Sequence, residues 1–174
     1  MFSWMKDNNI SIKSGVEVGV MKGGNAKYIL DMFPSLEKLY LVDCWHLDDY
    51  EISGEKYPRA SEKENYYITQ AVLEPYKNRV VFVPNISRNA VDKVNEELDF
   101  VYIDANHAYE WVKEDFTLWY PKVRKGGIIG GHDFHNVSGP TKFLFERAQP
   151  FFVCGTGEID GFNVPIFEWW IIKE

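Results

Sequence analysis

Short apolar runs alternate with amphipathic stretches along most of the chain. The runs are rich in β-branched and aromatic residues at successive positions, which is typical of parallel strands buried on both faces. Five such runs occur, at residues 15–20, 38–43, 79–84, 98–104 and 126–131. Each is predicted to be a β-strand.

Four stretches with helical character separate these runs, as the crossovers between parallel strands require. The predicted helices span residues 25–32, 61–76, 87–95 and 110–123. The second opens with Ser61 and Glu64, which have the spacing of a capping box. Strands that alternate with helices in this way predict an α/β fold with a doubly wound, mostly parallel, Rossmann-like sheet.

The C-terminal region has a different pattern. Residues 151–172 form two apolar runs joined by a link that is rich in Gly and Asp and too short for a crossover helix. This predicts a hairpin and hence an antiparallel strand at the edge of the sheet. Trp169 and Trp170 should face opposite sides of that strand, one buried and one partly exposed, and the exposed ring offers an edge for a homo-oligomer.

The length and the charge of the chain limit its partners. With 174 residues, of which 45% are hydrophobic, the chain should form a single domain over residues 1–174. A net charge of -7 disfavours binding to nucleic acid or to an anionic membrane, and a small neutral or cationic ligand fits better.

Cysteine usage and the absence of apolar segments predict the compartment. Cys44 and Cys154 lack the Cys-x-x-Cys spacing of redox or zinc sites, so buried reduced thiols are expected. The N-terminal residues lack the apolar core of a signal peptide, and no apolar run approaches the roughly 18 residues of a membrane span. A cytoplasmic protein without membrane contact is therefore expected.

Polar residues and glycines stand at the ends of the predicted strands. In a doubly wound sheet the ligand lies at the carboxyl ends of the strands. Five residues hold such positions in this sequence: Gly19, Asp43, Asn85, Asp104 and Asp133. Residues 46–60 show no clear periodicity and are predicted to form a mobile cover over the site.

The glycines after the first strand do not have the spacing of a phosphate-binding loop. Gly15, Gly19 and Gly23 are each separated by three residues, whereas a dinucleotide fingerprint needs Gly-x-Gly-x-x-Gly. A P-loop also fails, because Lys22 precedes the last glycines instead of following them. An acid, Glu17, stands two residues ahead of the turn and can anchor the loop or bind an ammonium group through water.

The pattern Glu17-x-Gly19-x-x-x-Gly23 resembles the first motif of class I S-adenosylmethionine-dependent methyltransferases. The resemblance implies that this loop lies under the methionine part of the cofactor and that the segment before Ser87 borders the adenine. Asp43, at the end of the second strand, suits the ribose hydroxyls. Asp43 and Ser87 could instead only cap the turn or helix that follows. The predicted cofactor-binding residues are Glu17, Gly19, Gly23, Asp43, Ser87 and Asp104.

Four polar side chains follow the fourth and fifth strands. Asp104 and His107 form an Asp-x-x-His pattern, and His132 and Asp133 are adjacent. Neighbouring parallel strands lie about 5 Å apart. The four side chains should therefore share one small volume and form a divalent-metal or acid/base centre.

This second pattern resembles the metal-dependent O-methyltransferase branch related to macrolide-sugar methyltransferases and to methyltransferase family 24. The resemblance implies that Asp104 and Asp133 hold a divalent metal and that His107 is the base, and the predicted metal site is Asp104, His132 and Asp133 with Mg²⁺ or Mn²⁺. His132 stands where the branch often has an acid, and imidazole suits Mn²⁺, Fe²⁺ or Zn²⁺ better than Mg²⁺. His132 could instead contact the substrate or act as a second base, with Asn136 or water as a metal ligand.

The leading hypothesis is metal-assisted O-methylation of a hydroxyl on a sugar or small natural product. An iron- or nucleotide-dependent hydroxylase or oxidoreductase and a non-catalytic cofactor-binding scaffold are alternatives. His107 could also be an ordinary surface or helix-capping residue. Helical spacing places Trp111, Phe116 and Trp119 on the helix after His107, more consistent with core packing than with a substrate platform.

Overall fold

The computed structural model describes most of the chain. The backbone is described throughout except at residues 46–49, 53–54, 58–59, 136–137, 148, 156, 160–161 and 165–166. Side chains are left out in addition at residues 50–52, 55–57, 60–62, 157–159 and 162–164. Most of the predicted cover at residues 46–60 therefore lies outside the described residues. The side chain of Ser61, from the predicted capping box, is also not described.

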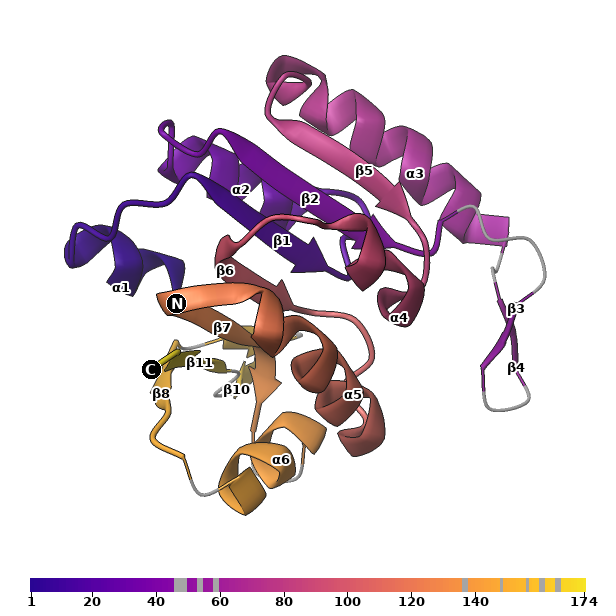
Figure 1. Ribbon diagram of the computed structural model, residues 1–174. Coiled ribbons are helices and arrows are strands. Elements are labelled where there is room, and N and C mark those ends of the chain that lie inside the picture. The colour runs from indigo at the N-terminus through magenta and orange to yellow at the C-terminus, as the bar shows by residue number, and fades with distance from the viewer. Residues whose placement is uncertain are drawn as a thin grey trace.

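A seven-stranded sheet forms the centre of the molecule, with the strand order β5-β2-β1-β6-β7-β11-β8 (Figure 1). Its parallel strands are β1 (Ser14–Val18), β2 (Lys38–Asp43), β5 (Val80–Pro84), β6 (Leu98–Ile103) and β7 (Val123–Phe134). At the other edge β11 (Phe167–Ile172) runs antiparallel to both β7 and β8 (Phe152–Cys154). The predicted doubly wound sheet with antiparallel C-terminal strands is confirmed.

Two smaller antiparallel pairs lie outside this sheet. One pair is β3 (Tyr50–Ile52) with β4 (Glu55–Tyr57), which extends away from the main sheet in Figure 1. The other is β9 (Gly157–Ile159) with β10 (Phe162–Val164), in the link between β8 and β11. The predicted C-terminal hairpin therefore carries a second, short ribbon in its connection.

Helices cover both faces of the sheet (Figure 1). The helices α1 (Phe2–Asp7), α2 (Gly24–Met32) and α3 (Ala60–Leu73) pack on one face. The other face is covered by α4 (Ser87–Ala90), α5 (Tyr109–Trp119) and α6 (Gly139–Arg147). Short 3₁₀ turns extend three of these helices, at Glu74–Tyr76, Val91–Lys93 and Tyr120–Lys122.

The sheet separates two hydrophobic cores. On one face Ile29 and Leu30 of α2 are buried with Phe100 of β6. On the other face Phe116 and Trp119 of α5 are buried with side chains of the central strands. Burying one apolar stripe of each helix against the sheet is the main favourable contribution to this architecture.

Several elements differ from the sequence-based predictions. The fifth strand was expected over 126–131 but extends to Phe134, so His132 and Asp133 lie within its end rather than after it. The helices α1 and α6 were not predicted. Both are short, and α6 begins with Gly139 and Pro140, residues that are more common in turns.

The prediction that one of Trp169 and Trp170 is partly exposed is wrong, because only 1% and 2% of their surfaces are accessible. The ring of Trp170 stacks on Phe152 with centroids 5.5 Å apart and lies 5.6 Å from Trp4. Trp169 packs against Phe116 on the opposite face. The helix α1 and the strand β8 thus cover the ring that a free edge would expose.

The two cysteines also differ from expectation. Cys44 and Cys154 are not joined in a disulfide, as predicted, but both are half-buried instead of fully buried. No helix within the described residues is long and apolar enough to cross a membrane. The single-domain organisation of residues 1–174 stays a prediction.

Candidate active site

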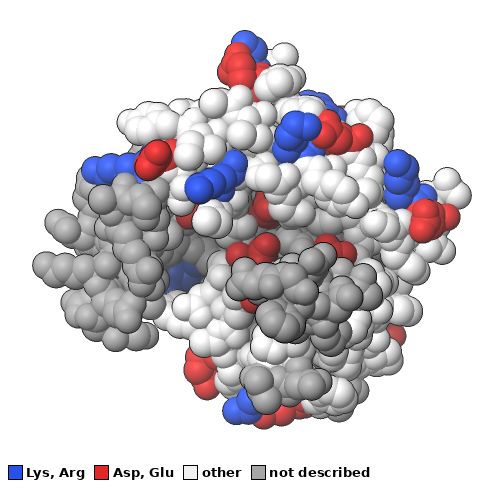
Figure 2. Space-filling view, turned by 180° about the vertical axis from the view of Figure 1, so that it is seen from behind, with Lys and Arg blue, Asp and Glu red and all other residues white. Residues whose placement is uncertain are grey.

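A cavity of about 1210 Å³ opens at the carboxyl ends of β1, β2, β5 and β6. It lies where the strand order reverses between β1 and β6, the place where doubly wound folds bind ligands. Four of the five predicted strand-end residues line it: Gly19, Asp43, Asn85 and Asp104. On the face shown in Figure 2, acidic side chains gather near the middle, whereas most Lys and Arg side chains lie nearer the edge.

The glycine loop between β1 and α2 forms one wall of the cavity. Gly19 has a φ of +89°, and a Cβ there would lie 2.3 Å from the carbonyl oxygen of Asp104. Gly23 is the N-cap of α2 with a φ of +77°, and it makes no side-chain cap hydrogen bond. The loop therefore needs both glycines, and the first turn of α2 begins at the cavity through Gly24 and Asn25.

Asp43 fixes this loop while it lines the cavity. Its Oδ2 atom accepts hydrogen bonds of 2.8 Å from the backbone N–H groups of Val20 and Met21. Its Oδ1 atom accepts one of 2.6 Å from the N–H of Cys44. The carboxylate thus caps the turn, which was the alternative role predicted for it, and in addition joins β2 to the glycine loop.

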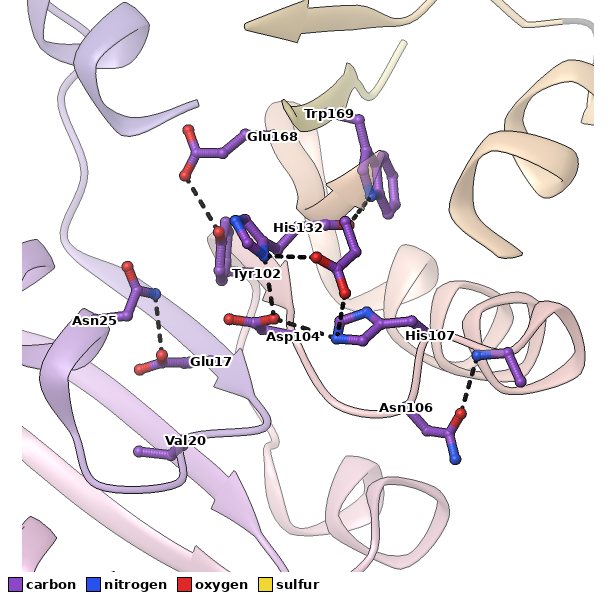
Figure 3. A network of polar contacts seen from close by, with 12 residues as sticks. Glu17, Val20, Asn25, Tyr102, Asp104, Asn106, His107, His132, Glu168 and Trp169 are labelled. Atoms are coloured by element: carbon purple, nitrogen blue, oxygen red, sulfur yellow. Dashed lines mark hydrogen bonds and ion pairs between the residues drawn. The ribbon is translucent and has the colours of Figure 1, made fainter. Parts of the chain in front are cut away.

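Glu17 is a buried carboxyl group at the cavity wall, with 1% of its surface exposed. Its Oε1 atom accepts a hydrogen bond of 3.0 Å from Nδ2 of Asn25 (Figure 3). Its Oε2 atom has no hydrogen-bond partner among the described residues. Burial raises the pKa of Glu17 to about 8, and the hydrogen bond from Asn25 opposes this shift.

The four side chains predicted to converge lie together at the ends of β6 and β7, and Figure 3 shows three of them, Asp104, His107 and His132. Nε2 of His107 lies 3.1 Å from Oδ2 of Asp133, and Nδ1 of His132 lies 3.1 Å from Oδ1 of the same carboxylate. Asp104 is farther away, with Oδ1 at 3.6 Å from His107 and 3.9 Å from His132. Asp133 has a φ of +59°, an uncommon conformation for a residue other than glycine.

Burial changes the proton affinities of this cluster. It raises the pKa of Asp104 to about 6, although the nearby His132 opposes this shift. It lowers the pKa of His107, against the attraction of the Asp133 carboxylate. A neutral His107 that donates its Nε2–H to Asp133 leaves Nδ1 as a proton acceptor.

The structure gives no support to the predicted metal site at Asp104, His132 and Asp133. Within the described part of the chain, no three His, Cys, Asp or Glu side chains are arranged to hold a metal ion. The closest contacts pair one nitrogen of each imidazole with an oxygen of Asp133. Asn136, the additional ligand considered from the sequence, lies outside the described residues.

The sequence also matches a family model. The model of a methyltransferase domain, methyltransferase family 24, matches residues 16–134, which include the glycine loop and all four side chains of the cluster. The chain belongs to this family. It is thus a class I S-adenosylmethionine-dependent methyltransferase, as the two sequence motifs predicted, and S-adenosylmethionine is its methyl donor.

Solved structures share the fold at low sequence identity. An O-methyltransferase from Bacillus cereus in complex with SAH is 14% identical, with a TM-score of 0.70 over 99% of this chain and 78% of that chain. An rRNA methylase from Streptococcus thermophilus is 11% identical, with a TM-score of 0.66 over 99% and 93%. A spermidine synthase from Thermotoga maritima is 14% identical, with a TM-score of 0.64 over 95% and 54%. A search of curated proteins finds no match.

At the end of the methyltransferase's cavity remote from the glycine loop, two residues differ from the sequence-based interpretation. Trp111 lines the cavity and is half-buried, so its placement in the core was wrong, whereas Phe116 and Trp119 are core residues as expected. Ser87, for which a helix-capping role was the alternative, is the first residue of α4, and Ile86 holds the N-cap position. The hydroxyl of Ser87 accepts a hydrogen bond of 2.8 Å from Nε1 of Trp119 instead.

Sequence reasoning did not find Asp115, which also lines this end of the cavity. Its side chain is buried, with 3% of its surface exposed, and is hydrogen-bonded to Ser87. Burial raises the pKa of Asp115 to about 6. The available signal was an acid in the amphipathic helix α5, next to the core residue Phe116.

Proposed function

We propose that this methyltransferase transfers the methyl group to a hydroxyl oxygen of a small molecule and that His107 accepts the hydroxyl proton. The observation that carries the proposal is the contact of 3.1 Å between Nε2 of His107, which lines the cofactor cavity, and Oδ2 of Asp133. A carboxylate that holds one imidazole nitrogen directs the other toward proton transfer.

The chemistry of the cavity wall supports one orientation of the cofactor. The N-terminus of α2 favours a carboxylate, and the unpartnered oxygen of Glu17 favours an ammonium group, so the amino acid part lies at the glycine loop. Oδ1 of Asp43, which accepts one backbone hydrogen bond, has a further site that accepts a ribose hydroxyl. The sulfonium methyl group then lies toward Asp104 and His107, and the adenine ring extends toward Ser87.

In this arrangement the reaction is a single displacement. The acceptor oxygen attacks the methyl carbon, the new O–C bond forms as the C–S bond breaks, and S-adenosylhomocysteine leaves. The proton of the hydroxyl passes to Nδ1 of His107, and the Asp133 carboxylate stabilises the resulting imidazolium. The cavity contributes by holding the two reactants in line.

Three observations favour this function over its rivals. The glycine spacing disfavours a nicotinamide cofactor, and the contact between His107 and Asp133 next to the cavity disfavours a role as a binding scaffold. A net charge of -7 disfavours an RNA substrate, although an rRNA methylase shares the fold. A divalent metal and a homo-oligomer stay predictions from the sequence, and no step above depends on either.

The proposal is tested with matched acceptors. The purified protein is incubated with methyl-labelled S-adenosylmethionine and with pairs of compounds that differ only in a hydroxyl or an amine, drawn from catechols, phenols and sugars. We expect the label in a methyl ether by mass spectrometry. Label in the amine partner only, or in added RNA only, would refute O-methylation.

A further inference from the structure

The glycine loop contains a left-handed residue that is not a glycine. Met21 lies between Gly19 and Gly23, lines the cavity and has a φ of +53°. This conformation is unfavourable for methionine, because its Cβ comes too close to the following carbonyl oxygen. With 63% of its surface exposed, Met21 gains little from packing that could offset the cost. Contacts of its backbone must therefore hold the conformation.

Hydrogen bonds on both sides of Met21 supply these contacts. Its N–H donates to Oδ2 of Asp43, and its carbonyl oxygen accepts a hydrogen bond of 2.8 Å from Nε1 of Trp45. The hydroxyl of Thr69 lies 2.9 Å from the same oxygen and 2.8 Å from the carbonyl oxygen of Asn65, and its one proton serves only one of them at a time. Within the described residues, the indole N–H of Trp45 donates to Met21 alone.

Trp45 is itself fixed by packing. Only 1% of its surface is exposed. The centre of its ring lies 5.4 Å from that of Tyr66 in α3 and 5.8 Å from that of Phe82 in β5. A ring buried against two elements presents its N–H in one direction. The indole can therefore impose a conformation on the exposed Met21 instead of following it.

We propose that Trp45 is a positioning residue for the cofactor, because its indole N–H holds Met21 in the left-handed conformation that gives the glycine loop its binding shape. This rests on the placement of the cofactor at the glycine loop under the proposed function, and not on the acceptor chemistry. Without the donor, Met21 relaxes to a negative φ, which turns its N–H away from Asp43. The loop then adopts the binding shape for only part of the time, and the affinity falls in proportion.

Isothermal titration calorimetry with S-adenosylhomocysteine tests the proposal. Trp45→Phe keeps an aromatic ring and removes the N–H, and we expect an affinity about tenfold lower, which corresponds to one hydrogen bond. Met21→Gly removes the need for this hydrogen bond, since glycine adopts a positive φ readily. The double variant Trp45→Phe/Met21→Gly should therefore regain an affinity within about threefold of the wild type. A merely structural role of Trp45 predicts no such rescue.

Asn9→Gly is the matched control for the rescue. Asn9 also has a φ of +53°, but it follows α1 and does not line the cavity. In the Trp45→Phe protein, Asn9→Gly should leave the tenfold loss of affinity in place. Equal rescue by the two glycines would refute the proposal, as would an unchanged affinity in Trp45→Phe. Calorimetry uses no acceptor, so these results are independent of the test for O-methylation.

The wild-type protein provides a further test in case Trp45→Phe does not fold. The ligand and the indole hydrogen bond favour the same loop conformation, so each must stabilise the other. By NMR, saturating S-adenosylhomocysteine should slow the hydrogen exchange of the Trp45 indole at least tenfold. The effect should exceed that on Trp169, whose Nε1 donates to the carbonyl oxygen of His132. Exchange of the Trp45 indole at the same rate with and without the ligand would overturn the proposal.

Discussion

The candidate active site has two halves that depend on different parts of the chain. The cofactor half depends on the backbone: Gly19 passes against β6, and Asp43 binds two consecutive N–H groups of the loop. The half that we propose faces the acceptor depends on side chains, with Asp133 of β7 between the imidazoles of His107 and His132. A main-chain arrangement tolerates few substitutions, whereas a side-chain arrangement can change its chemistry without a change in the fold.

This contrast predicts that the two halves fail in different ways. Substitutions in the side-chain cluster should change the rate of methyl transfer and spare both the fold and the binding of the cofactor. Substitutions in the loop should change stability and cofactor binding together.

Replacement of His107 by Ala should have the largest effect. The loss of a positioned general base lowers the rate by about 10³-fold, equivalent to about 4 kcal/mol in the activation barrier. The affinity for S-adenosylhomocysteine should change by less than about threefold, because the cofactor half keeps its contacts. Turnover with the best hydroxyl acceptor and calorimetry measure the two quantities. A parallel loss of affinity and rate would show that the halves are not separate.

Glu17 provides a test through stability. Its pKa is about 8 in the folded protein against 4.5 for an ordinary Glu, so the folded state keeps a proton that the unfolded state releases. The contribution of Glu17 to stability is therefore fully present below pH 4.5, is lost as the pH rises to about 8 and changes no further above that.

Urea unfolding in the absence of the cofactor would measure this contribution. Between pH 5 and pH 8 the wild-type protein should lose about 3 kcal/mol relative to Glu17→Gln, which cannot titrate. Other buried acids, such as Asp104 and Asp115, titrate in both proteins and cancel in the difference. If the free energy of unfolding depended on pH in the same way in both proteins, the raised pKa of Glu17 in the folded state would be contradicted.

The sequence predicted the cofactor half well because its signals are local. The strand β2 agrees to the residue, and the motif from Glu17 to Gly23 combines spacing with residue type. Elements whose burial depends on distant partners were missed. Trp170 is covered by Trp4 and Phe152, and no local pattern reveals contacts between residues so far apart in the chain.

Replacement of Gly19 by Ala should destabilise the protein by about 2 kcal/mol or more, since left-handed backbone alone costs about 1–2 kcal/mol. The added Cβ would also lie 2.3 Å from a backbone oxygen of Asp104. Gly24→Ala is the matched control, because nothing lies within 4 Å of a Cβ at that position. Urea unfolding should separate the two variants, and equal stabilities would refute the need for a glycine at position 19.

Residue types predicted which side chains of the acceptor half converge, but not their contacts. The spacing of Asp104 and His107 indicated a shared volume with His132 and Asp133, and it could not show that Asp133 lies between both imidazoles. Asp115 was missed for a similar reason, because periodicity alone does not tell which side of α5 faces a cavity. Rotation of a helix is set by its packing against the whole sheet.

Removal of divalent metals should have the smallest effect. The proposed proton transfer uses His107 and Asp133, so dialysis against EDTA should change the rate of methyl transfer by less than about twofold. The control adds Mg²⁺ or Mn²⁺ back to the dialysed protein, which should have no further effect. A loss of more than tenfold that Mn²⁺ restores would assign the side-chain cluster to a metal, as the resemblance of the sequence implied. If Mn²⁺ does restore the rate, the His107→Ala variant shows which residues bind the metal. A residual rate of this variant that still depends on Mn²⁺ would place the metal on Asp104, His132 and Asp133 and not on His107.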